Sequence, residues 1–230
     1  MCGLGSGCGE SRLLKGIEMT DSGVIINPLE IEARSFEIID GEAGKHGYDA
    51  LQWPVVRRII HTTADFDFAR TTVFSPEAVE AGIAALRRGE GILCDTNMVA
   101  AGVNKARLSA FGSDLRCHVA DPEVAETARA GGITRSIVAM RKGIDEGCGV
   151  FLVGNAPTAL FELLRQVREG RANPSLVVGV PVGFVGAEES KEVLLETELP
   201  FITCRGRKGG SAIAAAILNA LMILAGEPMR

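Results

Sequence analysis

The sequence predicts a three-layer α/β/α fold, built on a doubly wound, flavodoxin-like sheet of five parallel strands with extra N-terminal helices. Short apolar runs, rich in β-branched residues, occur at 91–95, 115–119, 149–154, 175–180 and 200–204. Helix-length segments between and after these runs lie near 122–130, 134–145, 156–169, 187–197 and 210–225. This alternation is typical of a parallel sheet that is covered by helices on both faces.

Three helices are expected before the first strand. Asn27 followed by Pro28 is a helix-start signal, and this helix is expected to end at Gly41. Its inward face is predicted to hold Ile31, Ser35, Ile38 and Ile39. A second helix over Asp49–Ile60 is predicted to bury Val56, Ile59 and Ile60. A third is expected within 77–89, after a Ser-Pro start.

The chain is expected to form one domain over residues 25–230. Residues 1–24 are Gly-rich and polar, which predicts a flexible N-terminal extension. The longest apolar run near the C-terminus, 212–224, contains Asn219 and is too short to span a bilayer. The first residues do not form a secretory signal, and the 6 cysteines are scattered. We therefore expect a cytoplasmic protein that does not bind membranes.

Composition and motifs argue against several functions. Aromatic residues make up 5% of the chain and its formal net charge is −5, which argues against nucleic-acid binding. The motifs GxGxxG, GxxxxGK[ST] and GxSxG do not occur, so nucleotide-binding loops and a serine hydrolase lack support. No cluster of His, Cys and Asp has metal-ligand spacing, so no metal site is expected.

Ligands of doubly wound sheets bind at the carboxyl ends of the strands, so the turns after the strands are candidate sites. After the third strand, Asn155 is expected to cap a helix, while free N–H groups and the Thr158 hydroxyl receive an anion. The alternative is an ordinary turn with a good cap. After the fourth strand, Gly183 and Gly186 flank an apolar pair and let the backbone approach a large flat ligand.

The turn after the fifth strand combines three cations with the start of a helix, which suits an anionic ligand. Its candidate binding residues are Arg205, Arg207, Lys208, Gly209, Gly210 and Ser211. The alternative is a solvated basic loop. Arg135 lies in the first turn of another helix, where a cation is unfavourable to the helix dipole. It is therefore a further candidate anion contact, unless it points to solvent.

His61 follows the second expected helix, and a spacing of three residues places Arg58 on the same side. Imidazole titrates near neutral pH, so His61 is a candidate acid–base residue. The alternative is a histidine that only complements the dipole at a helix C-terminus.

Read together, these segments resemble the precorrin-8X methylmutase family over nearly all of residues 26–224. The resemblance rests on the segments EIEARSFEII (30–39), VVRRIIHTTAD (55–65), ILCDTNMVAAGV (92–103), GITRS (132–136), VGNAPTALFELL (153–164), GVPVGFVGAEESK (179–191) and RGRKGGSAIAAAILNAL (205–221).

The resemblance implies an isomerase of cobalamin biosynthesis that moves a methyl group from C-11 to C-12 of a corrin-type macrocycle. The product would be hydrogenobyrinate, or cobyrinate when cobalt is already present. Family members are homodimers with the active site near the subunit boundary, and no cofactor is implied. The catalytic histidine of the family maps onto His61, and positions that face the ligand map onto Ser35, Arg58 and Arg135.

Two other functions remain open from the sequence. A non-catalytic corrinoid carrier would use the same anion-binding turns, with His61 as a structural or axial ligand. A nucleotide- or phosphosugar-binding enzyme on the same sheet lacks the phosphate motifs that it would need.

Overall fold

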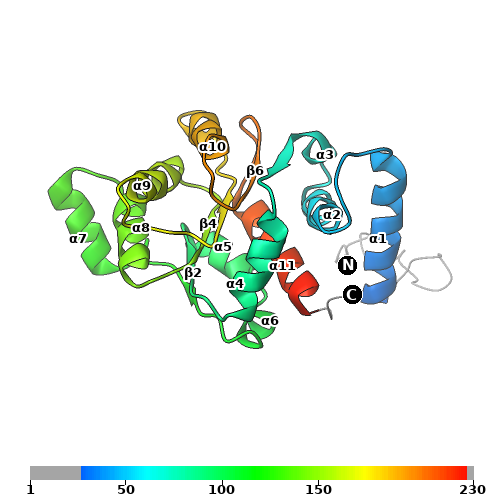
Figure 1. The fold of residues 1–230 in the computed structure, drawn as a ribbon, viewed down its shortest axis with the longest axis horizontal. Coiled ribbons are helices and arrows are strands. Elements are labelled where there is room, and N and C mark those ends of the chain that lie inside the picture. The colour runs from blue at the N-terminus through cyan, green and yellow to red at the C-terminus, as the bar shows by residue number, and fades with distance from the viewer. Residues whose placement is uncertain (1–26, 227–230) are drawn as a thin grey trace, which may run out of the picture.

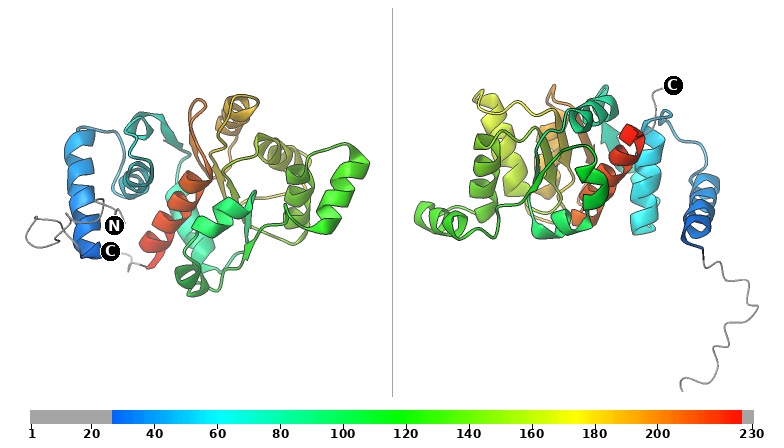
Figure 2. Two further views of the ribbon diagram at one scale, coloured as in Figure 1. Left: turned by 180° about the vertical axis from the view of Figure 1, so that it is seen from behind. Right: turned by 90° about the horizontal axis from the view of Figure 1, so that it is seen from below.

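The computed structural model describes residues 27–226, and the predicted extension over residues 1–24 lies outside this range. A central sheet lies between two layers of helices, as expected, and the helix α1 (Pro28–Ala43) forms an additional outer layer (Figures 1 and 2). No helix within residues 27–226 has the length and apolarity needed to cross a membrane.

The five predicted strands are all present and parallel. They are β2 (Ile92–Cys94), β3 (Leu115–Arg116), β4 (Val150–Val153), β5 (Leu176–Gly179) and β6 (Phe201–Cys204). Numbered along the chain, these five lie in the order 2-1-3-4-5 across the sheet, which is the flavodoxin-like order.

The sheet has one more strand than predicted, because β1 (Thr72–Phe74) pairs with β6 in antiparallel orientation at the edge. At three residues it is too short to show a strand pattern in the sequence. The short helices α3 (Phe68–Thr71), α5 (Asn97–Gly102) and α6 (Lys105–Ser109) were not predicted either.

Successive side chains along each strand point to opposite faces of the sheet, so the hydrophobic core has two parts. On one face, Ile92, Val150 and Leu176 pack beneath α2 (Gln52–Thr63), α4 (Ala78–Arg87), α5, α6 and α11 (Ser211–Gly226). On the other face, Leu93 and Phe151 pack beneath α8 (Arg135–Asp145), α9 (Pro157–Arg168) and α10 (Ala187–Leu195). Helix α7 (Pro122–Gly131) lies outside α8 (Figure 1).

The inward face of α1 differs from the prediction. The helix runs past Gly41 to Ala43, and Ile39 is buried, but Ile31 and Ile38 keep 45% and 43% of their surface exposed. The face toward α2 instead carries Phe36, Ile39 and two acidic side chains that pair with arginines of α2. The arginine-rich surface of α2 therefore decides how α1 is rotated, and apolar periodicity does not reveal this.

A buried carboxylate joins β2 to the start of α9. Asp95 is 3% exposed and accepts hydrogen bonds from the backbone N–H groups of Gly154 (3.1 Å), Asn155 (2.7 Å) and Ala156 (2.7 Å). Burial raises the pKa of Asp95, and these three donors oppose that rise. The next residue, Thr96, lies 3.3 Å from Ser211 between hydroxyl oxygens, so the start of α11 joins the same cluster.

We predict that Asp95→Ala lowers the free energy of unfolding by about 3 kcal/mol, since each buried donor left without a partner costs roughly 1–3 kcal/mol. Urea unfolding followed by circular dichroism measures the change. The matched control is Asp145→Ala at the exposed end of α8, which should alter stability by less than about 0.5 kcal/mol. Equal effects of the two substitutions would contradict a structural role for Asp95.

Candidate active site

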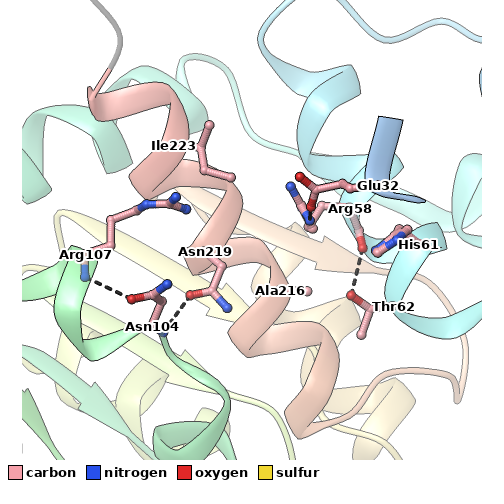
Figure 3. Close-up of a pocket in the computed structure, with 9 residues that line it drawn as sticks. All are labelled: Glu32, Arg58, His61, Thr62, Asn104, Arg107, Ala216, Asn219 and Ile223. Carbon is pink, nitrogen blue, oxygen red and sulfur yellow. Dashed lines mark hydrogen bonds and ion pairs between the residues drawn. The ribbon is translucent and has the colours of Figure 1, made fainter. Parts of the chain in front are cut away.

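A groove of about 370 Å³ opens between α1, α2, α6 and α11. Its lining residues are Glu32, Arg58, His61, Thr62, Asn104, Arg107, Ala216, Asn219 and Ile223. In Figure 3, α11 forms the floor, α6 contributes one wall, and α1 and α2 contribute the other. Of the predicted site residues, only Arg58 and His61 line this groove.

The burial pattern of α2 turns these two residues toward the groove. Val55, Val56, Ile59 and Ile60 are buried in the core. Arg58, His61 and Thr62 consequently lie on another side of the helix, where all three reach the groove. The predicted pairing of Arg58 with His61 on one side of the helix is therefore confirmed.

Phe36 and Glu32 of α1 hold the pair in place. The ring of Phe36 meets the imidazole of His61 edge-on with centroids 5.3 Å apart, and the guanidinium of Arg58 lies 4.8 Å from its centroid. Glu32 forms an ion pair with the same guanidinium. The arginine side chain is 18% exposed, whereas His61 is exposed, so the imidazole is the more accessible of the two groups. Sequence reasoning missed both α1 residues.

The opposite wall is fixed by two asparagines. Asn104 caps α6, its Oδ1 accepting from the backbone N–H of Arg107 at 2.9 Å. The backbone N–H of Asn104 donates to Oδ1 of Asn219 at 2.9 Å, and Nδ2 of Asn219 donates to the carbonyl of Gly102, also at 2.9 Å. The capping signal of Asn104 is visible in the sequence, but its partner on α11 is far away along the chain, so this wall was not predicted.

Part of the predicted anion site before α9 is occupied by a carboxylate of the chain itself. The N–H groups of residues 154–156 donate to Asp95, so they are not available to a ligand. Asn155 is exposed and does not cap the helix, because the N-cap is Ala156. Thr158 lies 3.1 Å from Thr134 between hydroxyl oxygens, which brings the start of α8, and the exposed Arg135, close to α9.

The turn before α11 is likewise bound mostly within the chain. The N–H of Gly210 donates to the carbonyl of Val180 at 2.9 Å, and Ser211 contacts Thr96. A Cβ on Gly209 would lie 2.3 Å from the same carbonyl oxygen, so only glycine fits there. The expectation that this helix start offers free donors is wrong at Gly210, because the loop is tied to the end of β5.

Lys208 is also engaged inside the chain. Its ammonium contacts Asp65 at 2.5 Å and Asp67 at 2.7 Å, in the segment that follows α2. Its backbone carbonyl accepts from the ammonium of Lys191 at 2.7 Å. Lys191 is fully buried, so its ammonium holds this turn from inside the protein. These bonds tie the turn before α11 to the end of α2, close to His61.

Arg205 and Arg207 remain accessible. They lie 3.6 Å from Glu192 and 3.7 Å from Glu188, and their side chains are 57% and 64% exposed. Surface pairs of this kind contribute little stability, so a ligand anion can displace them. Arg207 also lies over the exposed Phe184, 5.6 Å from the ring centroid. The remaining predicted residue, Ser35, donates its hydroxyl to the carbonyl of Ile31 at 2.7 Å and does not line the groove.

A family model described as precorrin-8X methylmutase matches residues 30–224. The chain belongs to this family.

Similar proteins cover most of the chain. A cobalt-precorrin-8 methylmutase from Priestia megaterium is 48% identical over 87% of this chain and 89% of its own length. A precorrin-8X methylmutase from a Sinorhizobium species is 44% identical over 83% and 92%. The solved structure of the precorrin-8X methylmutase from Thermus thermophilus is 47% identical, with a TM-score of 0.80, and the match covers 86% of this chain and 96% of that one.

These findings confirm the family expected from the sequence motifs. The matched region of the methylmutase family contains every residue of the groove and all the turns at the strand ends.

We predict that Lys208→Met lowers the melting temperature at pH 7, and that the loss shrinks at low pH. Lys208 holds the pKa of Asp65 and Asp67 below their usual value of 3.8. Carboxyls with a lowered folded-state pKa contribute stability above pH 3.8, and this contribution is lost as the pH falls through the lower folded-state pKa. Thermal unfolding at pH 7, 5, 4 and 3.5 measures the difference between the variant and the wild type.

The control is Lys105→Met on α6, an exposed lysine away from these aspartates. Its difference from the wild type should be small at every pH. A Lys208→Met difference that stays constant down to pH 3.5 would show that these ion pairs do not link α2 to the turn before α11.

Proposed function

We propose that this chain, as a member of the methylmutase family, moves the methyl group from C-11 to C-12 of precorrin-8X or its cobalt form, with His61 as the acid–base residue. The observation that carries the assignment of His61 is its position. It is an accessible imidazole at a groove, held by Phe36 and next to the ion-paired Arg58.

The reaction breaks the bond between C-11 and the methyl carbon and forms the bond from that carbon to C-12, while the π electrons of the macrocycle rearrange. The shift is an isomerisation, so it has no net oxidation and needs no external nucleophile. Partial proton donation from His61 to a ring nitrogen draws electron density from the ring and lowers the barrier to migration. An imidazole fixed by an aromatic edge loses little freedom when it donates.

The acetate and propionate arms of the macrocycle require dispersed cations. Arg205, Arg207 and Arg135 stay as proposed contacts, because all three side chains are exposed. Asn155 is a proposed contact through its side chain only, since Asp95 accepts its backbone N–H. Thr158 stays a proposed contact through its hydroxyl. The exposed loop between Gly183 and Gly186 presents Phe184 and Val185 to a flat ligand.

We also propose a cytoplasmic homodimer with the active site near the subunit boundary, as the family resemblance implies. The outer face of α1 supports an interface, because Ile31 and Ile38, seven residues apart on one side of the helix, are 45% and 43% exposed. Helix α1 also supplies Glu32 to the groove, so a partner subunit that covers this helix would lie close to the site.

We predict that His61→Ala lowers turnover at least about 100-fold, because positioned acid–base groups contribute roughly 10²–10⁴ in rate. Binding of the product should change little. The measurement is the absorption spectrum of the protein with precorrin-8X, or its cobalt form, since methyl migration extends the conjugation. His46→Ala is the matched control, because His46 stacks on Trp53 and does not line the groove.

Conversion by the wild type and by His46→Ala, but not by His61→Ala, would support the proposed role. Wild-type turnover in His61→Ala would show that it is wrong. A shifted spectrum without conversion by the wild type would indicate a corrinoid carrier.

A further inference from the structure

The groove contains an arginine that the family resemblance did not point to. Arg107 of α6 lines the wall opposite His61. Its backbone N–H donates to Asn104, but within residues 27–226 its guanidinium has no ion pair and no hydrogen bond. In Figure 3 the guanidinium extends over the groove, away from the backbone of α6.

The charges of the groove do not balance. Among the lining residues within 27–226, Glu32 is the one carboxylate, and it is paired with Arg58 on its own wall. The positive charge of Arg107 therefore has no counterpart among these residues. A guanidinium without an internal acceptor offers up to five N–H donors, arranged as a planar fork that matches a carboxylate.

The backbone that carries Arg107 is held firmly in position. Asn104 and Asn219 join the start of α6 to α11, and α5 packs so closely on α11 that a Cβ on Gly102 would lie 2.7 Å from the Cβ of Ala215. The distance between the two walls is therefore set by the fold. A ligand that enters the groove meets Arg107 at one wall and His61 at the other.

The volume of the groove limits the size of the ligand that it can hold. Its volume of about 370 Å³ is near the lower end of small-molecule pockets, which hold about 300–1,000 Å³. A substituted macrocycle does not fit inside as a whole, but one edge with a side arm does. The floor is formed by Ala216, Asn219 and Ile223 of α11.

We propose that Arg107 binds a carboxylate on a side arm of the substrate, so that the groove holds one edge of the macrocycle between Arg107 and His61. This inference rests on the proposed function for the identity of the ligand. The presence of a carboxylate subsite is a property of the groove itself and is testable without the macrocycle.

The first experiment measures product affinity by absorption titration. Arg107→Ala should raise Kd about tenfold, as expected for the loss of a charge-assisted pair at a partly open site, while Arg107→Lys should recover part of the loss. Lys105→Ala, which removes a charge from the same helix outside the groove, should leave Kd unchanged. The wild type and Arg107→Ala should bind the methyl ester of the product with the same Kd, because the ester has no carboxylate for Arg107 to bind.

The second experiment uses glutarate as a simple dicarboxylate. In ¹⁵N-labelled protein, the Nε–H resonance of Arg107 is identified by its absence from the spectrum of Arg107→Lys. Glutarate should shift this resonance, and an equal concentration of chloride should not. An unshifted resonance would overturn the carboxylate subsite.

The two experiments separate the two proposals. If the wild type binds and converts the substrate but Arg107→Ala has an unchanged Kd, the proposed function stands and the role of Arg107 is wrong. If glutarate shifts Arg107 but the product does not bind, the subsite stands and the proposed function fails.

Discussion

The carboxylate of Asp95 is the point on which the arrangement of this molecule depends. It sits at the end of β2, where the strand order reverses, and accepts three backbone N–H groups from the turn before α9. Through the neighbouring Thr96 the start of α11 is joined to the same place. A carboxylate of the chain thus takes the position at which many doubly wound proteins bind an anionic ligand. The groove with His61 lies instead between helices on one side of the sheet.

That groove depends on pairs of residues from distant parts of the chain. Helix α1 supplies Glu32 and Phe36 to the arginines and the histidine of α2, while Asn219 of α11 supports the start of α6. The core of that side of the sheet buries Val55, Val56, Ile59 and Ile60 of α2, which leaves the polar residues of α2 to form one wall. On α11, Ala216, Asn219 and Ile223 form the floor. The packing of α2 on the core therefore also decides which of its residues face the groove.

The sequence predicted what is encoded locally. Continuous apolar runs gave all five parallel strands, and helical spacing placed Arg58 with His61. It failed where the outcome depends on partners far along the chain. The rotation of α1 follows from ion pairs with α2, the free donors before α9 are taken by Asp95, and Arg107 reaches the groove only because α6 is held on α11. Local sequence patterns do not reveal contacts between residues that are far apart along the chain.

The edge strand β1 protects the sheet from pairing with the strands of other protein molecules. Without β1, the apolar strand β6 would present a row of unpaired backbone groups, which is a template for association with another chain. At the other edge, β3 has only two residues, and one of them is Arg116. Both margins of the sheet are thus too short to recruit a strand, which limits aggregation through sheet edges while the chain folds.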